Sequence, residues 1–188
     1  SAATMLLGNG LFQFGNVIII GTLIDNNKVI FVKGNWTNSG IFTASGIVKF
    51  GGAQPQQIFA TNFSSVVFNN TGNKIANGNL SISGNVQIDS GSTFTGNNFA
   101  HTVGGNWYKH ANGIFDDVGT TIQMNGNIPQ LISGGNFFNL DLLNAGEKIF
   151  TGNVHIAGNF ENQSTCSAGS YLFTLDSDFR KGATIATP

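Results

Sequence analysis

Charged residues are scarce in this 188-residue chain, since Asp, Glu, Lys and Arg make up 9% of it, where about 25% is usual. The formal net charge of −1 gives no electrostatic footprint for a nucleic acid or an anionic membrane. Disordered chains combine high net charge with few aromatic residues, whereas this chain has 17 Phe. We therefore expect a folded protein that binds no nucleic acid.

Cysteine and long apolar runs are also lacking. The lone Cys166 excludes an intrachain disulfide. The longest apolar run, Val17–Ile20, falls far short of the roughly 20 residues that span a bilayer, so the sequence predicts no membrane span. Residues Ser1–Leu7 lack the basic start and apolar stretch of a secretory signal. We expect any export signal to have been removed or to lie outside this sequence.

The chain is rich in Gly (26 residues) and Asn (25 residues), and it contains an internal repeat. A shift of 74 residues places residues 56–86 on 130–160 with 13 identities in 31 positions. The motif Gly34-Asn35-Trp36 likewise returns as Gly105-Asn106-Trp107. We interpret the chain as one continuous domain with a partial repeat (1–30), two units (31–100 and 101–175) and a C-terminal tail (176–188). The apolar pairs predicted to lie in the core are Ile58/Ile132, Phe63/Phe137, Ile75/Ile149 and Ile82/Ile156.

Short alternating segments, such as Leu80-Ser81-Ile82, are separated by a Gly-Asn dipeptide that occurs twelve times. Such alternation is typical of half-buried strands, and Gly and Asn accept the positive φ of a bend. Strands of sandwiches and barrels are usually longer. Three short segments make a coil of roughly 20–25 residues, so one repeat would be three or four coils. The sequence predicts an all-β fold, a β-solenoid (parallel β-helix) with Gly-Asn corners and stacked Asn amides; a β-sandwich is the alternative.

The repeated sequence motifs resemble those of large secreted surface proteins of Bacteroidota. The first unit carries Gly34-Asn35-Trp36-Thr37-Asn38-Ser39-Gly40-Ile41-Phe42, then Gly46-Ile47-Val48-Lys49-Phe50, then Gln56-Gln57-Ile58. The second unit repeats the pattern from Asn106-Trp107 to Phe138-Asn139-Leu140, although Met124 stands where Phe is usual. The resemblance covers residues 31–165. It implies extracellular β-helical coils of adhesin-like or structural proteins, often exported by the type IX route.

The sequence shows no catalytic, cofactor-binding or metal-binding cluster. A β-helical hydrolase or lyase would need paired carboxylates on one strand face, but the nine acidic residues are scattered along the chain. The adjacent pair Asp116-Asp117 is interpreted as a solvated loop. His101 and His110 lack a third metal ligand, and His155 occupies an outward strand position.

Trp36, Trp107 and Tyr108 are the candidate carbohydrate contacts, since exposed aromatic rings and amides suit such ligands; a buried structural position is the alternative for the two tryptophans. The leading hypothesis is a non-enzymatic extracellular or cell-surface module, structural or adhesive, from a longer surface or filament-forming protein. The alternative is a carbohydrate-binding or carbohydrate-processing β-helix. A solenoid without caps exposes strand edges and core. The expected partners are copies stacked end to end or further repeats of the same chain, with a surface glycan as a candidate ligand.

Overall fold

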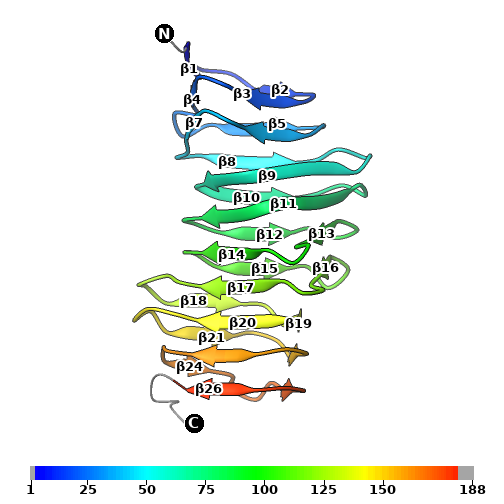
Figure 1. Ribbon diagram of the computed structural model, residues 1–188, viewed down its shortest axis with the longest axis vertical. Helices are drawn as coiled ribbons and strands as arrows, with labels where there is room; N and C mark the ends of the chain where they lie inside the picture. Colours follow the sequence, from blue (N-terminus) through cyan, green and yellow to red (C-terminus); the bar gives the residue numbers. More distant parts are fainter. Residues whose placement is uncertain (1–2, 182–188) are drawn as a thin grey trace.

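The computed structural model describes residues 3–181, which form a single stack of parallel β-strands (Figure 1). Each turn contributes strands to three faces, and face 1 has nine strands, so the stack has nine turns. The prediction of an all-β solenoid is confirmed, and the sandwich alternative is wrong. Residues 3–181 contain no helix, and hence none of the length and apolarity needed to cross a membrane.

The three faces are defined by their strands. Face 1 consists of β2 (Phe12–Phe14), β5 (Val29–Val32), β8 (Ile47–Phe50), β10 (Ser65–Phe68), β12 (Val86–Ile88), β15 (Trp107–Lys109), β18 (Gln130–Ile132), β21 (Lys148–Phe150) and β24 (Cys166–Ser167). Face 2 includes β3 (Val17–Ile19), β6 (Trp36–Asn38), β13 (Thr93–Thr95), β16 (Ile114–Asp116), β19 (Gly135–Phe137), β22 (Val154–Ile156) and β25 (Phe173–Leu175). Face 3 includes β1 (Thr4–Leu6), β4 (Thr22–Ile24), β7 (Ile41–Thr43), β14 (Ala100–Val103), β17 (Thr121–Met124), β20 (Asn139–Leu142), β23 (Phe160–Asn162) and β26 (Phe179–Lys181). The long strands β9 (Gln56–Phe63) and β11 (Asn73–Ile82) bend around one corner and serve both face 2 and face 3.

Alternation along each strand sets the core. In β8 the side chains of Val48 and Phe50 are buried, whereas Lys49 between them is only half-buried. Val48 pairs with Val66 on the next turn, and Val66 pairs with Val86. Inward columns of this kind continue along the stack as one apolar core. Each turn therefore buries its apolar side chains on its neighbours, which stabilises strands only three or four residues long.

The 74-residue repeat does not equal a whole number of turns. Trp36 lies on face 2 and pairs with Ile58, whereas its equivalent Trp107 lies on face 1 and pairs with Ile132. Equivalent residues are separated by three full turns and two of the three faces, a value between the predicted three and four coils. Inward positions are therefore retained between the units, but equivalent outward side chains point in different directions from the solenoid.

Most of the predicted core is confirmed. The buried members are Ile58, Ile132, Phe63, Phe137, Ile82 and Ile156. The prediction is wrong for Ile75 and Ile149, which are only half-buried and face outward. In their place the preceding residues, Lys74 and Lys148, point into the core and have no exposed surface.

Backbone carbonyls at the corners explain why these lysines face inward. Lys148 Nζ donates to the carbonyl oxygens of Gly126 and Gly146, at 2.9 and 2.5 Å. Lys74 Nζ donates in the same way at the equivalent corner of the first unit. Burial lowers the pKa of each lysine to about 8. An inward isoleucine would leave these carbonyls without a donor, which is costly for buried polar groups.

Asparagine supports the corners in two ways. Asn16 Oδ1 accepts the backbone N–H of Asn35, and Asn35 Oδ1 accepts that of Gln57, both at 2.8 Å. Asn70 instead adopts a φ of 65° and donates its side-chain amide to the carbonyl of Gly51 at 3.1 Å. The expected corner ladder thus exists, but these bonds run from side chain to backbone rather than from amide to amide.

Candidate functional site

Two of the three candidate carbohydrate contacts are core residues. Trp36 and Trp107 have 0% and 2% of their surface exposed, and Trp36 Nε1 donates to Thr61 Oγ1 at 3.0 Å. A buried indole presents no face to a sugar ring. Of the three, only Tyr108 remains as a candidate contact, because its side chain is 50% exposed on face 1.

His101 lies in the core rather than in a surface site. Its Nδ1 accepts the backbone N–H of Leu80 at 3.1 Å, and its Nε2 lies 3.0 Å from the carbonyl oxygen of Gly96. Burial lowers the pKa of His101 to about 4, so the imidazole is neutral at pH 7. Across residues 3–181, no three His, Cys, Asp or Glu side chains form a group that could hold a metal ion.

The adjacent acids of the second unit are separated by the end of a strand. Asp116 closes β16 and accepts a hydrogen bond from Thr95 Oγ1 at 3.1 Å. Asp117 follows in the turn, where burial raises the pKa of its carboxyl. Both side chains are half-buried, and the interpretation as a loop is wrong for Asp116, which belongs to a strand.

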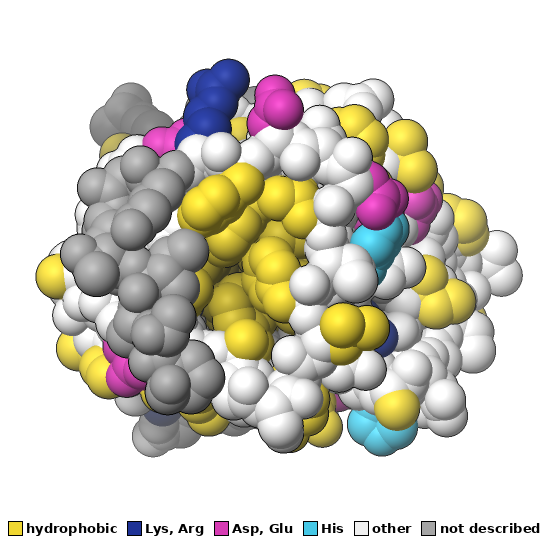
Figure 2. All heavy atoms as spheres, turned by 90° about the horizontal axis from the view of Figure 1, so that it is seen from below, with side chains coloured by type: hydrophobic (Ala, Val, Ile, Leu, Met, Phe, Trp, Pro, Cys, Tyr) yellow, Lys and Arg dark blue, Asp and Glu magenta, His cyan; other side chains and the backbone are white. Residues whose placement is uncertain are grey.

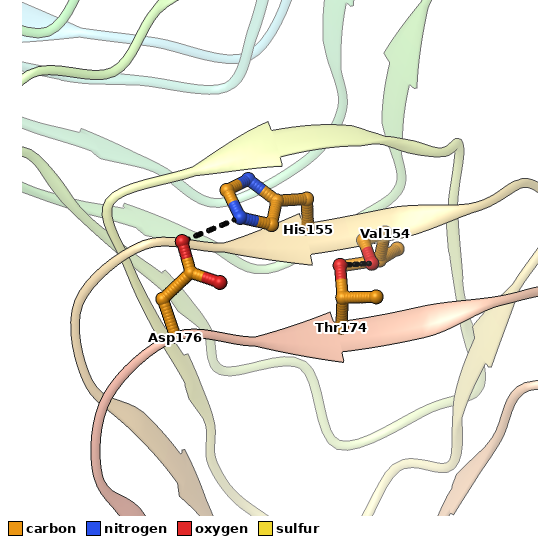
Figure 3. A network of polar contacts seen from close by, with 4 residues as sticks. All are labelled: Val154, His155, Thr174 and Asp176. Atoms are coloured by element: carbon orange, nitrogen blue, oxygen red, sulfur yellow. Dashed lines mark hydrogen bonds and ion pairs between the residues drawn. The ribbon is translucent and has the colours of Figure 1, made fainter.

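His155 faces outward on face 2, as its strand position predicts. Its Nε2 lies 2.8 Å from Asp176 Oδ2, which belongs to the next turn (Figure 3). The neighbouring Thr174 hydroxyl donates to the carbonyl of Val154 at 3.4 Å. The His155 and Asp176 side chains are 40% and 61% exposed, so this contact joins two turns but contributes little to stability.

A hollow lined by polar side chains lies on face 3, across β17, β20, β23 and β26; we call it the face 3 groove. Its lining forms two columns of outward residues. The first column is Thr121, Asn139 and Asn159, and the second is Asp141, Glu161 and Arg180. The hollow has a volume of about 200 Å³, and no apolar residue lines it.

Strand pairing creates the second column. Asp141 pairs with Glu161, and Glu161 pairs with Arg180, so each turn adds one charged residue at a spacing of about 4.8 Å. Burial raises the pKa of Asp141, and the charge of Glu161 raises it further, against the opposing effect of a hydrogen bond from Gln123 Nε2 at 3.1 Å. Among the described residues, the Arg180 guanidinium forms no ion pair with either carboxylate.

The expectation that the acidic residues are scattered is therefore wrong for this face. Asp141, Glu161 and Arg180 are 20 and 19 residues apart in the sequence, and each interval is one turn of the solenoid. The signal was present in the sequence as outward strand positions one coil apart. It could not be used without the coil length and the pairing register.

Comparison of the chain with protein-family models, curated protein sequences and solved structures gives no match.

Proposed function

We propose that the chain is a non-enzymatic extracellular module with a structural or adhesive role, and that further solenoid turns cover its ends. The additional turns come from a second copy or from further repeats of the same polypeptide, within a surface or filament-forming protein. The observation that carries this proposal is the exposure of core-type side chains at both ends of the described stack. The repeat resemblance to secreted surface proteins supports the extracellular location.

The N-terminal end leaves inward positions uncovered. Met5 in β1 pairs with the buried Leu23, yet the Met5 side chain is 51% exposed, since β1 is the outermost described strand of its sheet. An adjacent hollow of about 290 Å³ is lined largely by apolar residues, including Phe14 and Val17. The apolar residues of this surface are of the kind that fills the core in a cross-section of the solenoid.

The C-terminal end has the same character. Figure 2 shows hydrophobic side chains gathered at the centre of this end. Phe179 in β26 pairs with the buried Phe160 but is 44% exposed, and Phe173 in the same turn pairs with the buried Val154 but is only half-buried. Parallel strand edges with apolar side chains are templates for pairing with another chain.

Both ends of the described stack present a strand edge on each face. The last turn presents β24, β25 and β26, and the first strands at the other end are β2 on face 1, β3 on face 2 and β1 on face 3. Pairing of β1 of one copy with β26 of another would continue face 3 in the same parallel direction. Because the two surfaces differ, this contact is head to tail and propagates without closing on itself.

The alternative function, carbohydrate processing, is favoured by the neighbouring carboxylates of the face 3 groove. Paired carboxylates are the usual machinery of glycoside hydrolysis. Incubating the purified chain with a panel of polysaccharides and assaying new reducing ends and unsaturated products separates the two functions. Turnover would replace the non-enzymatic proposal.

Sedimentation velocity over a range of concentrations tests the role of the ends. We expect the chain to form elongated oligomers, and Met5→Asp and Phe179→Asp each to shift the distribution to monomer. Leu131→Asp is the matched control, because Leu131 has a similar exposure of 46% but lies on a strand inside the stack. Equal effects of all three substitutions would contradict the proposal.

A further inference from the structure

The charged side chains of the face 3 groove have polar atoms that bond to no other described residue. Asp141 uses Oδ2 to accept from Gln123, and Glu161 uses Oε1 to accept from Gln163. Within the described part of the chain, the other oxygen of each carboxylate has no hydrogen-bond donor, and neither has the Arg180 guanidinium an acceptor. The second column thus presents acceptors on two turns and a donor on the third.

The first column is held in place by contacts between turns. Asn139 Oδ1 accepts the backbone N–H of Asn159 at 2.8 Å, and Asn139 Nδ2 donates to Thr121 Oγ1 at 3.1 Å. These bonds fix one wall of the groove. The wall therefore keeps its shape when the other column binds a ligand, and less side-chain freedom is lost on binding.

Comparison of the two repeat units shows that the coil does not require these charges. At equivalent outward positions on face 1, the first unit has Val67 in place of Asp141 and Gln87 in place of Glu161. The same backbone therefore forms with an apolar or a neutral side chain. Val67 is buried at 9% exposure and Gln87 is half-buried, so the two units differ in the chemistry of these outward strand positions while the coil is retained.

We propose that the face 3 groove binds a neutral, linear glycan that lies along the solenoid axis. Hydroxyl groups of the glycan donate to the Asp141 and Glu161 carboxylates, and the Arg180 guanidinium donates to a hydroxyl or ring oxygen. The absence of apolar lining favours a ligand with a hydroxylated surface. Two carboxylates against one guanidinium repel a polyanion, and one polar residue per turn suits a polymer of repeating units.

The inference deepens the adhesive part of the proposed function by naming a ligand class, but it does not depend on association through the ends. The Asp141 and Glu161 carboxylates lie on β20 and β23, inside the stack, although the groove extends to Arg180 on the terminal strand β26. Loss of glycan binding and loss of end-to-end association are therefore separate outcomes, measured by different methods on the same samples.

Affinity electrophoresis in gels containing one soluble polymer tests the proposal directly. The neutral probes are mixed-linkage glucan, galactomannan and arabinoxylan, and the anionic probe is polygalacturonate. We expect at least one neutral polymer to retard the chain and polygalacturonate to have no effect. The double variant Asp141→Asn/Glu161→Gln should bind the polymer at least about tenfold more weakly, because a hydrogen bond to a charged group contributes more than one to a neutral group.

Asp89→Asn is the matched control. Asp89 also accepts a hydrogen bond from a glutamine amide, that of Gln87, but lies outside the groove. We expect this variant to bind as the unchanged chain does, and both variants to keep its melting temperature within a few degrees. Sedimentation of the double variant should also be unchanged, which keeps the test separate from that of the ends.

Three results would overturn the proposal. The first is that none of the neutral polymers retards the chain, and the second is that retardation survives in the double variant. The third is that calcium chloride alone raises the melting temperature of the unchanged chain, with this rise lost in the double variant and no glycan bound. That result would make the two carboxylates a cation site instead.

Discussion

Lys74 lies directly against Gln56 of the preceding turn: the two are lateral partners between β9 and β11, and both side chains are fully buried. Gln56 Oε1 accepts the N–H of Gly52 at 2.7 Å, and its Nε2 donates to the carbonyl of Val32 at 3.1 Å. Lys148 and Gln130 form the same pair in the second unit. Each of these buried Lys–Gln pairs provides hydrogen-bond partners for backbone N–H and carbonyl groups at a corner of the solenoid.

Replacing Gln56 with Leu should destabilise the fold by about 3 kcal/mol, because a buried N–H and buried carbonyls lose their partners. Gln57→Leu is the control, since Gln57 is adjacent, faces outward and is only half-buried. We expect its effect to stay below about 1 kcal/mol. Urea unfolding of both variants measures the difference, and equal losses would show that the inward amide has no special role.

Stability should rise as the pH is raised above 8. The folded-state pKa of Lys74 and of Lys148 is about 8, below the ordinary value of 10.5. Between these values the unfolded chain binds more protons, so the free energy of unfolding increases with pH, by about 2 kcal/mol for each lysine by pH 10. The contribution is lost as the pH falls through 8. Unfolding of Lys74→Met/Lys148→Met should show a flat profile over this range, and a slope equal to that of the unchanged chain would contradict the assignment.

His101 should make the protein sensitive to acid. Its pKa is about 4 in the folded state, against 6.5 for an ordinary histidine, so its contribution is complete above pH 6.5 and declines as the pH falls towards 4. The decline should amount to roughly 3 kcal/mol. We expect His101→Leu to remove this part of the pH dependence of unfolding, whereas His110→Gln leaves it unchanged. An identical acid profile in all three proteins would exclude His101 as the cause.

Equivalent core positions should have equal energetic effects despite lying on different faces. Phe63 and Phe137 are 2% and 1% exposed, and replacing either with Ala should cost about 3–5 kcal/mol. Phe138 is the neighbouring control, because its side chain is 38% exposed. We expect Phe138→Ala to cost about 1 kcal/mol or less in the same denaturation assay. A loss for Phe138→Ala as large as for Phe137→Ala would contradict the core assignment.

The strands and the core could largely be predicted from the sequence, because the alternation of apolar and polar residues and the Gly-Asn dipeptides between strands are local signals. Leu80-Ser81-Ile82 reads as a short strand on its own, and the structure buries Leu80 and Ile82 as expected. Lys74-Ile75 was harder, since the inward lysine depends on carbonyls from the preceding turn. Hydropathy alone assigns the isoleucine to the core.

The groove could not be predicted because it depends on register. Asp141 and Glu161 become neighbours only when the turn length is known, and the 74-residue repeat does not supply it. Since that repeat covers three and two-thirds turns, equivalent residues occupy different faces. Superposing the two units therefore does not show which outward side chains become neighbours on one face.

Electron microscopy of the purified chain at increasing concentration tests whether further turns cover the ends of this solenoid. Nine turns at about 4.8 Å each give a copy about 40 Å long. We expect rods of constant width whose length grows with concentration in steps of about this size, and we expect Phe179→Asp to shorten them. Single particles of one copy at every concentration, with both ends in solvent, would contradict it.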